Sequence, residues 1–209
     1  IDDFGYPLDM ALSPDGIKMA VSYMRVNGNK ISTHIAFYNF GSAGQMELNN
    51  QVGELNVDDV LAPQIFFCDN STAVAVRTDG FTVFSGSQSP KEKKTVKFDQ
   101  EIISTFHDGN RIGFVFDGGD SGHKYLMKVY NTGGKNTMQK YFDLQYNSIT
   151  LQKDKIVLFN EKEFAIYKLN GQKTFQGKYR KPIQNVLSIR GFRKYMVITE
   201  DSADLIRLG

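Results

Sequence analysis

The sequence contains no tryptophan, a single cysteine and no long apolar run. Without tryptophan the chain cannot form the Trp-Asp pairs of WD repeats or the tryptophan docking motifs of quinoprotein-type blades. Cys68 cannot form an intramolecular disulfide, and its position beside an apolar segment predicts a small buried thiol. No apolar run approaches the roughly 18 residues of a membrane span, and no segment resembles a signal peptide.

An excess of one charge is also missing, because 25 lysine and arginine residues stand against 23 aspartate and glutamate residues and give a net charge of +2. DNA and RNA binding depends on strong electrostatic attraction, so we expect no nucleic-acid partner. The chain does contain 41% hydrophobic and 12% aromatic residues, which is enough in 209 residues for a substantial core. We therefore expect a folded domain.

Residues that bind metals or catalyse reactions are few and scattered. The histidines His34, His107 and His123 have no ligand-like spacing, so a zinc site is not expected. The loop at residues 117–122 carries oxygen donors, but it lacks the glutamate and the repeated acids of calcium loops. Ser121 and His123 are two residues apart, and no third group near them completes a hydrolytic triad. We expect no metal ion, no cofactor and no catalytic residue.

The stretch at residues 12–23 introduces a pattern that recurs along the chain. Its Ser13-Pro14-Asp15-Gly16 has the residue types of a tight turn, and the apolar run Met19-Ala20-Val21 follows. Four later segments repeat the order of strand, polar turn, strand, turn and third strand, and their first turns lie roughly 37 to 55 residues apart, as in propeller blades. The sequence predicts an all-β β-propeller segment of four to five blades, at residues 7–58, 59–100, 101–144, 145–181 and 182–209.

Some segments are less regular. Residues 41–62 fit either one short helix or a fourth strand with a long connection. Residues 25–30 are interpreted as an enlarged loop, in which Asn27-Gly28 suits a turn with both corners at positive φ. Residues 90–94 are interpreted as a solvated hairpin. Fourth strands that alternate apolar and polar side chains, as half-exposed blade edges do, are expected at residues 95–98, 140–143 and 175–179.

Several motifs resemble a known family: YPLDMALSPDG at residues 6–16, IAFYNFG at 35–41, SGSQ at 85–88 and LIRL at 205–208. They resemble a family of unknown function from Clostridia, whose members have an N-terminal membrane helix and a propeller-like extracytoplasmic region. The resemblance covers nearly the whole chain. It implies that the chain is the C-terminal part of a larger propeller of about seven blades, attached to the membrane through an anchor outside this sequence. It supplies no catalytic residues.

Two functions remain open at this point. The first is a non-catalytic extracytoplasmic interaction or sensor module that binds a protein, a peptide or a cell-wall glycan through the propeller face. The second is a hydrolase-like enzyme whose site is completed by N-terminal blades outside this chain. A glycan-cleaving propeller needs paired carboxylates on its innermost strands, where this sequence offers only Asp9. The interaction module is therefore favoured.

The residue just after the second strand of each repeat falls on the loop face that propellers commonly use for binding. These residues are all polar and of mixed charge, which favours a peptide or glycan partner: Arg25, Arg77, Asp117, Asn160 and Glu200. The fifth repeat ends on a third strand, and the short acidic stretch at residues 1–5 is a poor fourth strand. We therefore expect an incomplete ring whose exposed edges allow a homodimer of the fragment.

Overall fold

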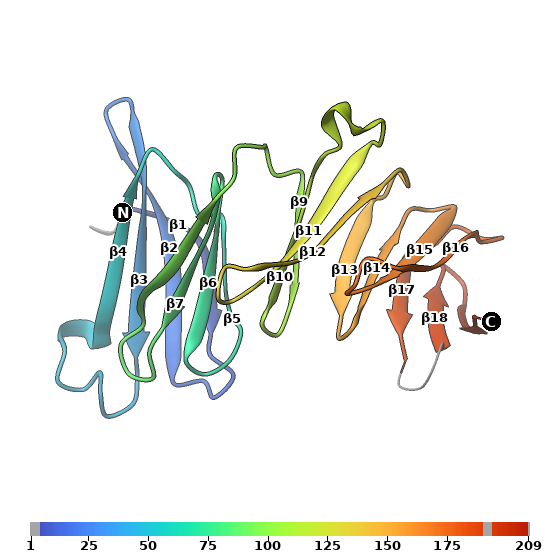
Figure 1. Ribbon diagram of the computed structural model, residues 1–209. Helices are drawn as coiled ribbons and strands as arrows, with labels where there is room; N and C mark the ends of the chain where they lie inside the picture. Colours follow the sequence, from blue (N-terminus) through green and yellow to red (C-terminus); the bar gives the residue numbers. More distant parts are fainter. Residues whose placement is uncertain (1–4, 190–193, 209) are drawn as a thin grey trace. The chain divides into compact units, whose positions relative to one another are not determined.

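The computed structural model describes residues 5–189 and 194–208. The chain is nearly all β, with 60% of its residues in strands and 3% in helical turns. The strands form antiparallel sheets in which each strand pairs only with its neighbours in sequence (Figure 1). The predicted all-β propeller fold is confirmed. The chain divides into two compact units, unit 1 at Ile1–Ile102 with Thr132–Gly134 and unit 2 at Ile103–Asn131 with Lys135–Gly209.

Unit 1 contains two four-stranded sheets. The first sheet is formed by β1 (Tyr6–Leu12), β2 (Lys18–Asn27), β3 (Lys30–Asn39) and β4 (Gln51–Asp58). The second is formed by β5 (Gln64–Phe67), β6 (Thr72–Arg77), β7 (Gly80–Ser85) and β8 (Lys91–Lys97). Small alanines on the facing strands allow the two sheets to pack closely, and the rings of Phe37 and Phe84 meet between them with centroids 4.8 Å apart.

Unit 2 contains two four-stranded sheets and a three-stranded one. The third sheet is β9 (Ser104–Asp108), β10 (Arg111–Asp117), β11 (Tyr125–Asn131) and β12 (Asn136–Phe142). The fourth is β13 (Ser148–Gln152), β14 (Lys155–Phe159), β15 (Glu163–Lys168) and β16 (Lys173–Lys178), and the fifth is β17 (Asn185–Ser188), β18 (Lys194–Ile198) and β19 (Ala203–Arg207). Separate apolar clusters fill the space between the third and fourth sheets and between the fourth and fifth.

The first turn forms as its residue types predict. Gly16 adopts a φ of 71°, and its N–H donates to the carbonyl oxygen of Ser13 at 2.8 Å. The carboxylate of Asp15 accepts hydrogen bonds from the hydroxyl of Ser13 at 2.5 Å and from the N–H of Ile17 at 3.1 Å. These bonds hold the pKa of Asp15 below its ordinary value. Side-chain hydrogen bonds within the turn thus fix the register of the first hairpin.

The two segments without a regular sequence pattern, residues 41–62 and 25–30, are more ordered than expected. Residues 41–62 contain both a 3-10 turn, η1 (Leu48–Asn50), and the fourth strand β4. The enlarged loop expected at residues 25–30 is a tight turn, because β2 and β3 stay paired up to Asn27 and Lys30. Gly28 has a φ of 61°, as expected, but Asn27 does not have a positive φ. Valine and isoleucine in opposite positions extend this ladder.

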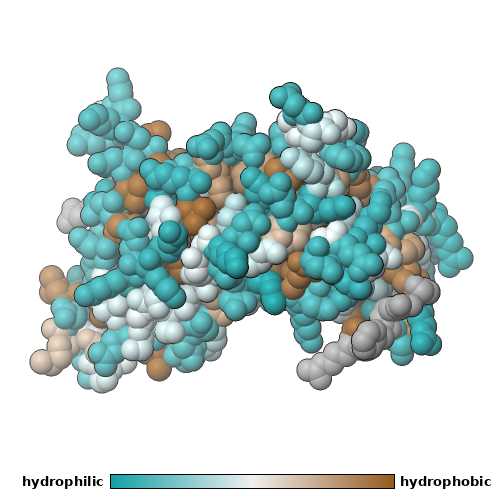
Figure 2. Space-filling model, in the orientation of Figure 1, coloured by the Kyte–Doolittle hydropathy of each residue, from teal (hydrophilic) through white to brown (hydrophobic). Residues whose placement is uncertain are grey.

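The charged segment at residues 90–94 is solvated, as predicted, but it is not a hairpin. From Lys91 onward it belongs to the exposed strand β8. The fourth strands β12 and β16 likewise begin four and two residues earlier than expected, at Asn136 and Lys173. Backbone pairing continues through these polar residues because their side chains point into solvent. Figure 2 shows a mainly hydrophilic surface. Met46, two residues before η1, and Leu48, the first residue of η1, are 90% and 84% exposed.

Candidate functional site

The candidate site lies at one end of unit 2, where the fourth and fifth sheets meet. In an antiparallel meander the connection before the first strand and the turn after the second strand reach the same end of the sheet. In the fourth sheet these are the segments before β13 and after β14, and the N–H of Asn147 donates to the carbonyl oxygen of Phe159 at 2.9 Å. The N–H of Ile183, just before β17, donates to the carbonyl oxygen of Glu161 at 2.9 Å. Backbone hydrogen bonds thus hold the three segments together.

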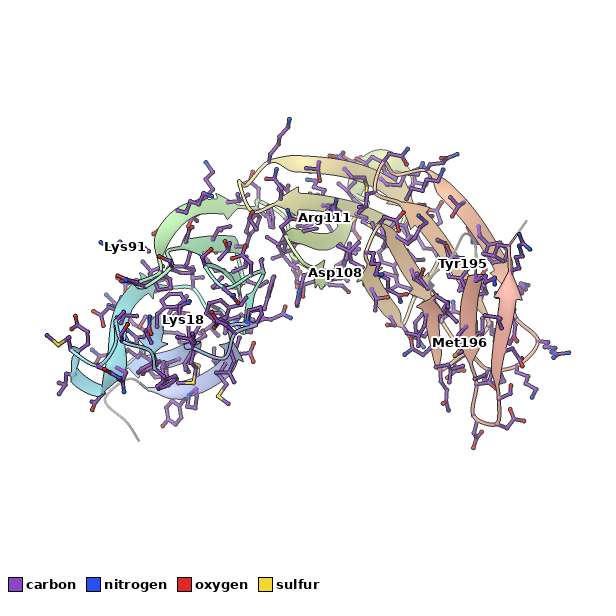
Figure 3. All side chains as sticks on the ribbon, turned by 90° about the horizontal axis from the view of Figure 1, so that it is seen from below. Lys18, Lys91, Asp108, Arg111, Tyr195 and Met196 are labelled. Atoms are coloured by element: carbon purple, nitrogen blue, oxygen red, sulfur yellow. The ribbon has the colours of Figure 1, made fainter. Side chains whose placement is uncertain are left out.

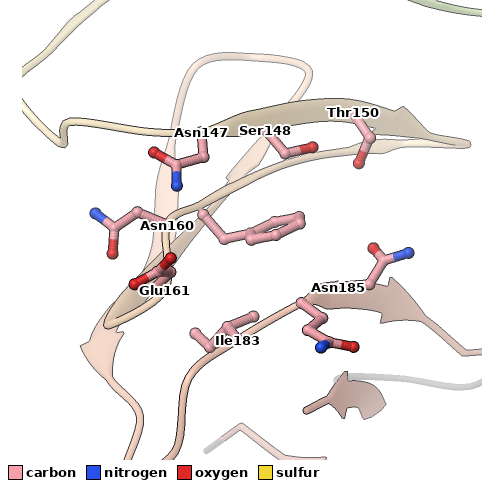
Figure 4. A pocket seen from close by; sticks show the side chains of 9 residues that line it. Asn147, Ser148, Thr150, Asn160, Glu161, Ile183 and Asn185 are labelled. Carbon is pink, nitrogen blue, oxygen red and sulfur yellow. The ribbon is translucent and has the colours of Figure 1, made fainter. Parts of the chain in front are cut away.

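These segments line an open pocket of about 360 Å³, shown in Figure 4. Pockets of this size accommodate small ligands or a short portion of a polymer. The lining comes from three chain segments, at Asn147, Ser148 and Thr150, at Phe159, Asn160 and Glu161, and at Ile183, Gln184 and Asn185. Phe159 and Ile183 are 5% and 4% exposed and belong to the core between the sheets. The pocket therefore combines an apolar base with polar walls.

Several polar side chains of the pocket are occupied by structural hydrogen bonds. The side-chain oxygen of Asn160 accepts from the N–H groups of Lys162 at 2.8 Å and Glu163 at 3.0 Å, and its amide nitrogen donates to the carbonyl oxygen of Gln145 at 2.5 Å. Asn160 therefore shapes the rim, because its hydrogen-bonding groups are committed to the turn. The side-chain oxygen of Asn185 accepts from the N–H of Val186 at 2.8 Å.

Other polar side chains of the pocket remain available. Within residues 5–189 and 194–208, no protein group hydrogen-bonds the side chains of Asn147, Ser148, Glu161 and Gln184. An amide side chain offers both donors and an acceptor, as hydroxyl groups of sugars and peptide bonds also do. The pocket can therefore bind a neutral polar ligand by hydrogen bonds while Phe159 and Ile183 contact its apolar face.

The pocket has little of the chemistry that catalysis needs. Its lining contains one carboxylate, Glu161, and no histidine, cysteine or lysine. Glycoside hydrolysis uses two carboxylates, and nucleophilic catalysis uses a nucleophile beside a base. The arrangement therefore fits binding better than bond cleavage.

Three of the polar residues predicted from the sequence belong to unit 2. Asn160 lines the pocket, whereas Asp117 and Glu200 do not. Asp117 is the last residue of β10, and its carboxylate accepts the N–H of Gly119 at 2.7 Å, which starts the turn η2 (Gly119–Ser121). Glu200 is exposed two residues after β18. The structure thus places one of the three in the pocket.

The two predicted arginines belong to unit 1, and their side chains have protein partners. Arg25 lies within β2, because the hairpin is longer than expected, and its Nη1 donates to the side-chain oxygen of Asn56 at 2.9 Å. Arg77 ends β6 with 5% exposure and donates two hydrogen bonds of 2.8 Å to Asp79. Its guanidinium therefore holds the turn to β7, a role that the sequence pattern did not suggest.

Most of the pocket could not be predicted, because Asn147, Gln184 and Asn185 lie in or beside the connections between repeats. Such connections have no hydrophobic period. The sequence did contain one signal. In each repeat, the connection enters the first strand at the same end of the sheet as the turn that follows the second strand. The rule that selected Asn160 therefore also selects the residues that precede β13 and β17.

The histidines and the cysteine are not part of this pocket. His34 is 1% exposed on β3, with its Nδ1 2.7 Å from the side-chain oxygen of Asn56, and burial lowers the pKa of its imidazole. His123 pairs with Asp143 at 2.8 Å. Cys68 is half-buried, and burial followed by the nearby charge of Asp69 raises the pKa of its thiol to about 12. The thiol form therefore dominates at neutral pH.

The described residues contain neither a metal-binding cluster nor a membrane-spanning helix. Among residues 5–189 and 194–208, no group of three or more histidine, cysteine, aspartate or glutamate side chains is arranged to hold a metal ion. In the same part of the chain, no helix combines the length and the apolar character needed to cross a membrane.

Solved structures similar to this chain are propeller-like proteins. Sqt1 from Chaetomium thermophilum is 12% identical with a TM-score of 0.64, and the match covers 99% of this chain and 59% of Sqt1. BamB from Moraxella catarrhalis is 9% identical with a TM-score of 0.51, and the match covers 97% of this chain and 74% of BamB. This chain thus spans little more than half the length of Sqt1. At such low identity the likeness establishes the fold alone.

No curated protein sequence matches the chain. The resemblance to a family of unknown function, inferred from the sequence motifs, is confirmed by a match over nearly the full length. Because that match extends over residues 1–208, the chain belongs to the family of unknown function DUF5711.

Proposed function

We propose that this chain is a non-catalytic interaction or sensor module that acts outside the cytoplasm and binds a peptide, a protein segment or a cell-wall glycan. The observation that carries the proposal is the pocket of about 360 Å³ at the end of unit 2. Its available groups are the amides of Asn147 and Gln184, the hydroxyl of Ser148 and the carboxylate of Glu161. A propeller-type fold supports many unrelated functions, so the proposal rests on this site.

The chemistry of the pocket favours a neutral polar ligand. Amide side chains can donate to and accept from the same sugar hydroxyl or peptide group, which a charged side chain cannot do. Phe159 and Ile183 at the base offer an apolar contact. A sugar ring and an extended peptide both present a polar edge beside an apolar surface. Either ligand would satisfy both parts of the pocket.

The enzyme alternative has less support. A hydrolase would need a second catalytic group beside Glu161, and none of the lining residues supplies one. Such a group would have to come from a part of the protein outside this chain. We therefore propose binding without turnover.

The extracytoplasmic location rests on the resemblance to Clostridial proteins that carry an N-terminal membrane helix. We propose that the full-length protein displays this module on the outer side of the membrane. Protease treatment of intact cells that produce the full-length protein tests this. Digestion of the module in intact cells supports the proposal, and protection until the membrane is opened contradicts it.

Binding is tested with the purified chain, cell-wall glycan fragments and a set of unstructured peptides, by isothermal titration calorimetry. Replacement of Asn147 or Gln184 by alanine removes one or two hydrogen bonds, so binding should weaken about tenfold for each. Asn136 and Gln139, exposed on the outer strand β12, provide matched controls of the same residue types. Equal weakening in N136A and Q139A, or no effect of N147A and Q184A on a ligand that the wild type binds, contradicts the proposal.

A further inference from the structure

The fifth sheet has one strand fewer than the others. Each of the other four sheets has a fourth strand that pairs antiparallel with the outer edge of the third strand, as β16 does with β15. In the fifth sheet the third strand, β19, pairs with β18, and no strand within residues 5–189 and 194–208 pairs with its other edge. An edge strand presents N–H and C=O groups to which a further strand can bond. The edge of β19 is therefore a candidate binding site for a strand.

The strand register indicates which backbone groups of β19 point outward. The N–H of Thr199 donates to the carbonyl oxygen of Ser202 at 2.9 Å, so these residues form a hydrogen-bonded pair at the turn between β18 and β19. Hydrogen-bonded and non-hydrogen-bonded pairs alternate along an antiparallel ladder. Asp204 and Ile206 therefore direct their backbone groups toward β18. The alternate residues direct theirs outward, and these are Ala203, Leu205 and Arg207.

One face of the fifth sheet carries an apolar row that ends at this edge. Leu187 on β17 lies opposite Met196 on β18, and Met196 lies opposite Leu205 on β19. Tyr195 and Met196 are labelled in Figure 3, and as neighbours in a strand they belong to opposite faces. Tyr195 is part of the core between the fourth and fifth sheets, whereas Leu187 and Leu205 are 39% and 61% exposed. An apolar residue opposite Leu205 on an added strand would extend this row.

The same face is basic beside the apolar row. Lys194 lies directly opposite Arg207, both side chains are exposed, and like charges in opposite positions destabilise a sheet. Among the described residues, no carboxylate lies within 4.0 Å of either charged group, since Asp201 and Asp204 pair with Lys181 and Arg180 instead. An acidic residue opposite Arg207 on an added strand would offset the repulsion.

We propose that the edge of β19 binds an extended segment of a partner protein as an antiparallel fourth strand. The segment has an acidic residue opposite Arg207 and, because every second residue lies on the same face, a large apolar residue two positions later, opposite Leu205. Backbone hydrogen bonds supply affinity in this mode of binding, and the two side chains supply selectivity. The residues of β19 do not line the pocket, so the proposal does not depend on the ligand of the pocket.

A second copy of the chain fits this edge less well. The acidic residue of β19, Asp204, lies on the opposite face of the sheet from Arg207. Residues directly opposite each other in a ladder share a face, so a second β19 strand cannot place an acid opposite Arg207. Pairing of two β19 strands would therefore leave the repulsion between Lys194 and Arg207 in place in both copies.

The test measures binding of a fluorescent synthetic peptide to the purified chain by fluorescence anisotropy. The peptide alternates threonine with glutamate, leucine and valine, in that order, and a control peptide has lysine in place of glutamate. The lysine peptide should bind at least about tenfold more weakly, because it brings a third positive charge beside Lys194 and Arg207.

Backbone methylation separates strand pairing from charge attraction. The leucine nitrogen of the peptide lies in a hydrogen-bonded pair with Leu205, so its methylation should weaken binding at least about tenfold. The nitrogen of the following threonine points away from β19, and its methylation should change affinity less than about twofold.

Variants of the chain test the same edge. Leu205→Pro removes an outward N–H without removing a bond to β18, and proline is tolerated on the free edge of a sheet. It should bind the peptide at least about tenfold more weakly than Leu205→Ala, which keeps the N–H, and a melting temperature close to that of Leu205→Ala excludes unfolding. Arg207→Gln should reduce the preference for the glutamate peptide over the lysine peptide, whereas Arg111→Gln, at an exposed arginine of β10, should leave it unchanged.

Binding of the glutamate peptide that depends on the leucine nitrogen, Leu205 and Arg207 supports the proposal. Equal binding of the two methylated peptides, or no effect of Arg207→Gln on the preference between the peptides, overturns it. A wild type that binds no peptide also overturns it, and two further measurements then identify what fills the edge. Peptide binding by a chain without residues 1–4 would indicate the chain's own first residues, and a dimer in sedimentation that Leu205→Pro dissociates would indicate a second copy.

Discussion

The guanidinium of Arg77 and the carboxylate of Asp79 form two hydrogen bonds of 2.8 Å each across the turn between β6 and β7. Arg77 is buried, and Nη1 also donates to the hydroxyl of Thr82 at 3.3 Å. A bidentate charged pair of this kind fixes the direction of both side chains. An arginine that the sequence suggested for ligand binding thus has a structural role in the hairpin.

Replacement of Arg77 by alanine should lower the free energy of unfolding by about 2 kcal/mol, because a hydrogen-bonded charged pair is lost and Thr82 loses a partner. Urea unfolding measures this. Lys97 provides the control, since its ammonium lies 4.0 Å from the same carboxylate and its side chain is 70% exposed. K97A should change stability by less than about 0.5 kcal/mol. Equal effects of the two variants would contradict the structural role of Arg77.

Gly113 on β10 packs directly against a buried ring. A Cβ at this position would lie 2.1 Å from two ring carbons of Phe106. Gly113→Ala should therefore destabilise the chain by about 1–3 kcal/mol through overpacking. In the double variant Gly113→Ala/Phe106→Leu the smaller side chain makes room, so the combined loss should be smaller than the sum of the single losses. Additive losses would show that the close contact is not the cause.

Stability should depend on pH through His34. Burial lowers the pKa of His34 below its ordinary value of 6.5, so the unfolded chain binds this proton more readily than the folded one. The associated stability is fully present above that value and decreases as pH falls below it toward the folded pKa. Between about pH 7.5 and pH 5.5, the free energy of unfolding, measured with urea, should fall more in the wild type than in His34→Gln. Parallel pH profiles for the two proteins would contradict this.

Cys68 should react slowly with alkylating reagents. Its pKa of about 12 leaves very little thiolate at pH 8, and the thiolate is the reactive form. Iodoacetamide labelling followed by mass spectrometry should therefore be at least about tenfold slower in the folded chain than in urea. A folded chain that reacts as fast as the unfolded one would show that Cys68 is more accessible than the structure indicates.

The repeating architecture could be predicted because its signals are local. Turn residues such as Pro14, Asp15 and Gly16 specify a hairpin within a few positions, and buried strands read as apolar runs. The outer strand β8 was predicted too short because Lys91 and Lys94 carry no apolar signal, although they pair with Ser85 and Val83 of β7. Backbone hydrogen bonds hold this part of β8 in the sheet, and the pattern of apolar and polar side chains does not reveal them.

The candidate site was only partly predictable. Asn160 could be placed at a strand end by counting repeats, but its commitment to the turn and to Gln145 depends on three-dimensional contacts. Gln184 comes to the pocket because the N–H of Ile183 bonds to Glu161, which lies 22 residues earlier in the sequence. No local pattern reports such a long-range contact.

The central claim, that the pocket at the end of unit 2 binds a neutral polar ligand, is tested most directly by nuclear magnetic resonance. Cell-wall glycan fragments or peptides that bind in calorimetry are titrated into isotope-labelled chain, and the side-chain amide signals are followed. We expect the largest shifts at Asn147 and Gln184, with the signals of Asn136 and Gln139 unchanged. Shifts confined to residues outside the pocket, for a ligand that binds, would contradict the claim.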